Sequence, residues 1–168
     1  KHAVYLTDDG RMNVAGLKFL YGVTLDRPKV AERLLWPKVP HKKPVILSGS
    51  EVEKLLGAVS SPVASMVLAT AYGAGLRISE ACRLRPEDID SKRGLIHVRL
   101  GKGGKDRYVM LSHRLLQALR AYWAQVRPQG EWLFPGHKKG KHLDTSTANH
   151  ALKYAAASVK MRKHVTAH

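Results

Sequence analysis

The sequence predicts a mainly α-helical fold with one small antiparallel β-sheet, an α+β arrangement in which the sheet is the minor part. Over most of the 168 residues, apolar side chains recur at helical spacing, and residues that commonly cap helices precede several of these segments. Between residues 95 and 111 the pattern changes to two short runs of branched and aromatic residues around a glycine-rich loop. That pattern is typical of a β-hairpin.

The first 36 residues are predicted to form helices without a core of their own. Val14–Tyr21 has amphipathic spacing, and Val30–Leu35 reads as a short helix after a turn. A segment of about 36 residues is too short to bury a core alone. Residues 37–44 contain three prolines and three lysines, which favours an extended linker. We therefore expect a domain boundary there and a second domain over residues 45–168.

The second domain begins with a capping box, in which Glu51 follows Ser48 by three residues just before an apolar run. Gly75 closes a later, Ala- and Val-rich helix that we expect to be buried. Cys82 and Tyr154 are expected to lie in the core. The predicted helices are Val52–Val59, Pro62–Ala74, Ile78–Leu84, Ser112–Val126 and Thr145–Val159, and the predicted strands are Leu95–Leu100 and Asp106–Leu111.

The composition narrows the function. Lys and Arg number 29 against 13 Asp and Glu, a net charge of +16. The excess positive charges repel one another, which favours a polyanionic partner. Nucleic acid is favoured over a membrane surface as that partner. The alternative is that the basic residues only keep the surface solvated. The single cysteine excludes a disulfide scaffold, and no apolar run is long enough to span a membrane. We expect neither a metal nor a cofactor.

Two motifs carry the candidate chemistry. A glycine turn delivers Arg77 to the start of a helix, where anions are favoured and a guanidinium adds donors suited to phosphate; the alternative is a surface arginine paired with Glu80. In the hairpin loop, Lys102 and Lys105 could both reach phosphates, or could form a plain solvated turn. A Walker-type nucleotide loop does not fit, because Lys102 is followed by glycine between two strands.

These motifs together resemble the tyrosine recombinase (phage integrase) family, and most closely its Xer-type and transposon-borne members. The resemblance lies in Tyr72-Gly-Ala-Gly-Leu-Arg-Ile-Ser-Glu-Ala-Cys-Arg-Leu84, in Glu87-Asp-Ile-Asp90 and in Val98-Arg-Leu-Gly-Lys-Gly-Gly-Lys-Asp-Arg-Tyr-Val-Met-Leu111. Trp132-Leu-Phe-Pro-Gly136 and Lys163-His-Val-Thr-Ala-His168 are similar to later landmarks of the family. It implies the recombinase catalytic fold over residues 45–168, incomplete at its C-terminus, and the end of a helical core-binding domain over residues 1–36.

The resemblance also implies chemistry. Such enzymes break and rejoin double-stranded DNA without metal, through a tyrosine that becomes linked to a 3′-phosphate while cationic groups stabilise the charge on the phosphoryl oxygens. Arg77 and His168 match phosphate-holding residues, and Lys102, favoured over Lys105, matches the lysine that protonates the leaving oxygen. Glu80 is then a supporting residue that orients the helix of Arg77. Expected contacts with the DNA backbone are Lys42, Lys43, Lys105, Arg107, Lys138 and Lys139. For the basic loop of Lys138 and Lys139, a simply solvated loop is the alternative.

The second arginine and the nucleophilic tyrosine of the family are expected beyond residue 168, so we expect this chain alone to be inactive and monomeric. The full-length parent is expected to form a synaptic tetramer on DNA, in the cytoplasm. The alternatives are a non-enzymatic DNA-binding module or a decayed recombinase fragment. A type IB topoisomerase is a further alternative, but the Xer-like sequence around Arg77 argues against it. An RNA-binding protein is not supported, because the sequence has no cluster of aromatic residues for stacking on bases.

Overall fold

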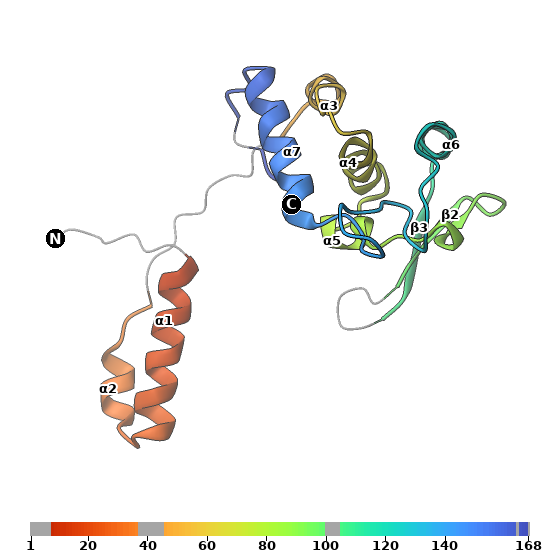
Figure 1. The fold of residues 1–168 in the computed structure, drawn as a ribbon. Coiled ribbons are helices and arrows are strands. Elements are labelled where there is room, and N and C mark those ends of the chain that lie inside the picture. The colour runs from red at the N-terminus through yellow and green to blue at the C-terminus, as the bar shows by residue number, and fades with distance from the viewer. Residues whose placement is uncertain (1–7, 37–45, 100–104, 164, 168) are drawn as a thin grey trace. The chain divides into compact units, whose positions relative to one another are not determined.

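The computed structural model describes residues 8–36, 46–99, 105–163 and 165–167. The chain divides into two compact units, Lys1–Pro44 and Val45–His168, and the predicted linker at residues 37–44 lies outside the described residues. The elements in chain order (Figure 1) are α1 (Asp8–Phe19), the π-helical turn η1 (Leu20–Thr24), α2 (Pro28–Arg33), α3 (Gly49–Gly57), α4 (Pro62–Ala74), α5 (Ile78–Cys82), the short 3-10 helix η2 (Pro86–Asp88), β1 (Ile89–Asp90), β2 (Leu95–Val98), β3 (Arg107–Met110), α6 (His113–Val126) and α7 (Thr145–Ser158).

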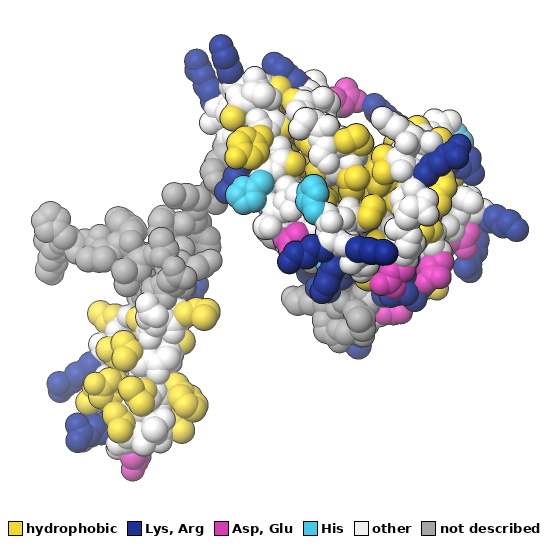
Figure 2. Space-filling model, in the orientation of Figure 1, with side chains coloured by type: hydrophobic (Ala, Val, Ile, Leu, Met, Phe, Trp, Pro, Cys, Tyr) yellow, Lys and Arg dark blue, Asp and Glu magenta, His cyan; other side chains and the backbone are white. Residues whose placement is uncertain are grey.

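The described part of the first unit is a pair of helices with almost no interior. Lys18 Nζ donates a hydrogen bond of 2.9 Å to the carbonyl of Ala31 and so ties α1 to α2. Among the residues of α1 and α2 whose burial the structure describes, only Ala31 is buried. Figure 2 shows hydrophobic side chains on the surface of this unit, and the exposed ones are Met12, Leu17, Phe19, Leu20, Val23, Leu25, Val30, Leu35 and Trp36.

The helices of the second unit begin at capping residues. The predicted capping box is confirmed, since Ser48 Oγ accepts a bond of 3.2 Å from the amide of Glu51, and Glu51 Oε2 accepts one of 2.7 Å from the amide of Ser48. Ser61, Ser112 and Asp144 cap α4, α6 and α7 in the same way, each accepting from a backbone amide two or three residues on. These caps fix where the helices that frame the core begin.

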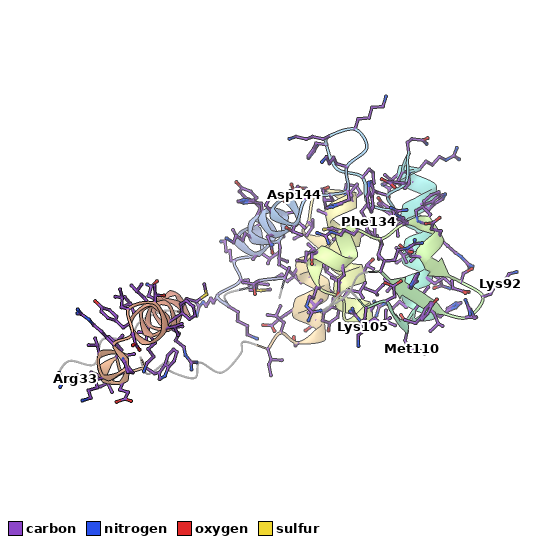
Figure 3. All side chains as sticks on the ribbon, turned by 90° about the horizontal axis from the view of Figure 1, so that it is seen from below. Arg33, Lys92, Lys105, Met110, Phe134 and Asp144 are labelled. Atoms are coloured by element: carbon purple, nitrogen blue, oxygen red, sulfur yellow. The ribbon has the colours of Figure 1, made fainter. Side chains whose placement is uncertain are left out.

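Helix α4 is the centre of the second unit. It packs against α3, α5, α6 and α7, and six of its 13 residues are buried, in agreement with the buried helix that the Ala- and Val-rich sequence predicted. The chain after α6 adds Phe134, which is fully buried and labelled in Figure 3. The hydroxyl of Tyr122 donates to the carbonyl of Leu133 at 3.0 Å, so the one polar atom of this buried ring is satisfied.

The sheet has three antiparallel strands in the order β1–β2–β3, one more strand than predicted. Its register pairs Ile96 with Val109 and His97 with Tyr108. One face of β2 buries Ile96 and Val98, whereas the opposite face of the hairpin leaves Tyr108 exposed. The predicted hairpin and the predicted α+β fold class are therefore confirmed. The glycine-rich loop at residues 100–104 lies outside the described residues.

One core prediction was wrong. Tyr154, expected to lie in the core, is 75% exposed, because α7 turns Ala148, Leu152 and Ala155 toward the core and Tyr154 away from it. Cys82, by contrast, is fully buried as predicted. None of the helices that the structure describes combines the length and the apolar character needed to cross a membrane.

Candidate functional site

The turn between α4 and α5 presents Arg77 at the surface. Gly75 adopts a left-handed conformation (φ 64°), which a residue with a side chain rarely adopts, and so ends α4. The amide of Leu76 then bonds to the carbonyl of Ala71 at 2.9 Å, and the buried Leu76 side chain anchors the turn. Arg77 follows as the residue that caps α5, with its side chain half exposed.

Glu80 holds Arg77 in two places. Glu80 Oε2 accepts a bond of 2.8 Å from the backbone amide of Arg77, and Oε1 accepts one of 3.2 Å from Nη1 of the same residue. The carboxylate therefore both caps the start of α5 and restrains one side of the guanidinium. This contact was predicted as the alternative to a phosphate-binding role, and the geometry allows both because Glu80 uses only part of the guanidinium.

Arg107, the first residue of β3, completes the cluster. Its Nη1 and Nη2 donate to Oε1 and Oε2 of Glu80, both at 2.8 Å, although the two residues are 27 apart in the chain. The Glu80 carboxylate is only 8% exposed. Its pKa is lowered to about 2, mainly by the hydrogen bonds from Arg107, and the pKa of Arg107 is raised by the same pair. Two guanidinium groups thus share one carboxylate, which leaves one net positive charge.

An open pocket of about 520 Å³ lies at this cluster. Its lining residues are Gly75, Leu76, Arg77, Arg107 and Ala167, so the segment at residues 165–167 comes next to both arginines. Among the described residues, nothing accepts a hydrogen bond from Nε or Nη2 of Arg77. The pocket can therefore receive an anion on donors that are already restrained.

Four of the predicted site residues, Lys42, Lys43, Lys102 and His168, lie outside the described residues. Lys105 is exposed just before β3 and is labelled in Figure 3. The structure therefore brings together Arg77, Glu80 and Arg107. Arg107, which is expected to meet a DNA phosphate, has both terminal nitrogens bonded to Glu80.

Lys138 and Lys139 are exposed on a basic loop that the rest of the fold supports closely. The amide of Gly136 bonds to the carbonyl of Lys141 at 2.8 Å, closing the loop at its base. Trp132 donates from Nε1 to a carbonyl at the far end of the loop at 3.1 Å, and a guanidinium lies 5.1 Å above its ring. Figure 2 shows that other Lys and Arg side chains are spread over several parts of the surface of this unit.

Sequence reasoning missed a second arginine–carboxylate pair, which lies at the end of β2 just before the glycine-rich loop. Arg99 donates to the buried Asp88 at 2.7 Å and to Glu87 at 2.8 Å. The arms that lead into and out of the glycine-rich loop are thus each fixed by an arginine. The available signal was the placement of Arg99 and Arg107 on either side of the loop, with acidic residues at 80, 87 and 88.

The described residues contain no group of three or more His, Cys, Asp or Glu side chains placed to hold a metal ion. His97 shows the nearest approach to such a group. It lies 3.0 Å from Asp106 and 3.8 Å from Asp88, and it stacks on Tyr108.

Known proteins are similar to this chain in sequence and in fold. The family model described as the phage integrase family matches residues 46–168. A putative integrase/recombinase (y4qK) of Sinorhizobium fredii is 45% identical over 99% of this chain and 56% of its own length, and a second one (y4eF) is 43% identical over 99% of this chain and 69% of its own. The tyrosine recombinase XerA of Thermococcus kodakarensis is 40% identical over 71% of this chain and 43% of its own length.

Solved structures agree on the fold. A lambda integrase dimer bound to a COC' core site superposes with a TM-score of 0.71 at 15% identity, over 93% of this chain and 47% of that one. A XerA recombinase superposes with a TM-score of 0.62 at 24% identity, over 93% of this chain and 63% of that one. The chain spans between about two fifths and two thirds of the length of the curated relatives described above. The family model and the two Sinorhizobium relatives show that this chain belongs to the phage integrase family of tyrosine recombinases.

Proposed function

We propose that this chain is the part of a site-specific DNA recombinase that binds duplex DNA and holds the phosphate to be cleaved. The observation that carries the proposal is the pocket where Arg77 keeps part of its guanidinium available beside Glu80 and Arg107. Preorganised cationic donors stabilise the charge that develops on phosphoryl oxygens during transesterification. The net charge of +16 supports a polyanionic partner.

In the reaction we propose, a tyrosine attacks the phosphorus, a 3′-phosphotyrosyl bond forms and the 5′-oxygen leaves with a proton. Arg77 and His168 hold the phosphoryl oxygens, and Lys102 gives the proton to the leaving oxygen. Lys105 meets neighbouring backbone phosphates, as do Lys42, Lys43, Lys138 and Lys139. Residues 1–36 are the end of a helical core-binding domain, and residues 37–44 are the linker.

None of the six tyrosines of this chain is assigned as the nucleophile. Tyr122 is buried with its pKa raised to about 12 by desolvation, which opposes formation of a phenolate. Tyr154 faces away from the core of the unit on α7. We propose that the chain alone does not cleave DNA. We further propose that it binds DNA as a monomer, while the full-length parent acts as a tetramer.

Two measurements test this function. Binding to a labelled duplex of arbitrary sequence, followed by fluorescence anisotropy at several salt concentrations, should show affinity falling steeply with salt. Arg77→Ala should weaken binding about tenfold and reduce the salt slope by about one phosphate contact. Arg114→Ala is the matched control, because it removes an exposed guanidinium that pairs with Glu53 at 2.8 Å, and its salt slope should match that of the unaltered chain.

Incubation with nicked suicide substrates, followed by denaturing electrophoresis, tests the missing nucleophile. No covalent protein–DNA adduct should form, and an adduct formed by this chain alone would show that one of its own tyrosines attacks. Equal DNA affinity of the unaltered chain and Arg77→Ala at every salt concentration would show that the pocket at Arg77 does not bind the phosphate. Sedimentation of a stable tetramer without DNA would contradict the monomer.

A further inference from the structure

The hydrogen bonds of Arg107 commit one edge of its guanidinium to Glu80. Nη1 and Nη2 each donate one bond to the two oxygens of Glu80, at 2.8 Å each. Turning toward a phosphate would break this bidentate pair and leave a carboxylate that is only 8% exposed without its main partner. Losing two short charged hydrogen bonds at a mostly buried carboxylate is costly, which favours the pair of Arg107 with Glu80.

Each oxygen of Glu80 serves both arginines. Oε1 accepts from Nη1 of Arg107 and from Nη1 of Arg77, and Oε2 accepts from Nη2 of Arg107 and from the backbone amide of Arg77. The fork of Arg107 fixes the plane of the carboxylate, because a bidentate pair is planar. The fixed carboxylate then restrains the guanidinium of Arg77 from one side.

We propose that Arg107 is a positioning residue that acts on the phosphate through Glu80 and Arg77. It also ties the start of β3, and therefore one arm of the lysine-bearing hairpin, to the start of α5. Lysine in its place would keep the charge but lose the planar fork, so Arg107→Lys isolates the geometry. The inference rests on the proposed function for its effect on DNA binding, whereas the restraint on Arg77 can be measured in the free protein.

The first test measures the order of the Arg77 side chain without DNA. Nitrogen relaxation of the Nε–Hε group of Arg77, assigned by its loss in Arg77→Ala, should show a markedly lower order parameter in Arg107→Lys. Glu80→Asp should lower the order parameter of Arg77 in the same way, because it keeps the charge but moves the carboxylate away from the two arginines. This variant provides the test if Arg107→Lys folds poorly. Arg99→Lys is the matched control, since it alters an arginine–carboxylate pair just after the neighbouring strand β2 and should leave Arg77 unchanged. Unchanged order of Arg77 in folded Arg107→Lys and Glu80→Asp would overturn the inference.

The second test is a double-mutant cycle on duplex DNA affinity. Arg107→Lys should weaken binding about threefold in the unaltered chain and leave it unchanged in the Arg77→Ala background, because residues that act through one another are not additive. Equal weakening in both backgrounds would show that Arg107 meets DNA independently and would overturn the inference. If Arg77→Ala itself binds DNA like the unaltered chain, the proposed function fails at this site, and the order parameters alone still decide whether Arg107 positions Arg77.

Discussion

Acid should weaken the fold through Glu80 by an amount that the structure specifies. The pKa of this carboxylate is lowered from 4.5 to about 2, with the hydrogen bonds from Arg107 as the largest cause. At about 1.4 kcal/mol per pKa unit, a shift of this size corresponds to at most about 3.5 kcal/mol. Arg107 is about one third exposed, so solvent screening reduces the expected contribution to about 1–2 kcal/mol.

The sign follows from the direction of the shift. The pKa of Glu80 is lower in the folded state than in the unfolded state, so the stabilisation is complete above pH 4.5 and disappears as the pH falls toward about 2. Other carboxylates titrate over the same range. The informative quantity is therefore the difference in unfolding free energy between the unaltered chain and Glu80→Gln, which cannot titrate at this position.

Urea unfolding followed by far-ultraviolet circular dichroism measures this difference at several pH values. The advantage of the unaltered chain over Glu80→Gln should shrink by about 1–2 kcal/mol between neutral pH and the acid end of the range. Glu87→Gln is the matched control, because it removes an exposed carboxylate that pairs with Arg99 at 2.8 Å. Its effect should be smaller than that of Glu80→Gln, because the side chain of Glu87 is 62% exposed and solvent screens its pair with Arg99. A constant difference for Glu80→Gln would refute the assignment of the low pKa to the pair with Arg107.

Three further predictions concern the packing of the second unit. Phe134→Ala should lower the free energy of unfolding by about 3–5 kcal/mol, because it empties a fully buried site, whereas Met110→Ala, at a 76% exposed position, should change it by under about 0.5 kcal/mol in urea unfolding. Gly136→Ala should lower the melting temperature in calorimetry, because a Cβ there would lie 2.5 Å from a backbone oxygen across the loop. Gly57→Ala, which has open space around it, is the control and should raise the melting temperature slightly. Equal melting temperatures for the two variants would contradict the clash at Gly136. Cys82 should react with a thiol reagent only after denaturation, because burial raises its pKa to about 11, and rapid reaction of the native protein would contradict that burial.

Local patterns in the sequence predicted much of this fold. The capping box of Ser48 and Glu51 and the left-handed Gly75 depend on residues close together in the chain, and both were found. The hairpin was also predicted, because its branched residues and glycines lie within seventeen positions. The two-residue strand β1 was missed, since Ile89 and Asp90 form a strand only by pairing with β2.

The rest depends on contacts that the spacing of residues does not encode. Tyr154 was expected to be buried, yet only the packing of α7 on its neighbours decides which side of this Ala-rich helix faces the core. Arg77 and Glu80 could be paired from their spacing of three. The partner of Glu80 across 27 residues could not, and that pairing is the basis for the positioning role that we propose for Arg107.

The surroundings of Trp132 provide an optical signal for the basic loop. Its indole is bonded to the carbonyl of Gly140, lies under Arg85 and meets His142 edge-on, so any shift of the loop alters the polarity and quenching around this ring. With Trp36 and Trp123, both largely exposed, replaced by phenylalanine, the emission of the chain would come from this one position. Titration with DNA would then show, without an added dye, whether Lys138 and Lys139 move when the duplex arrives.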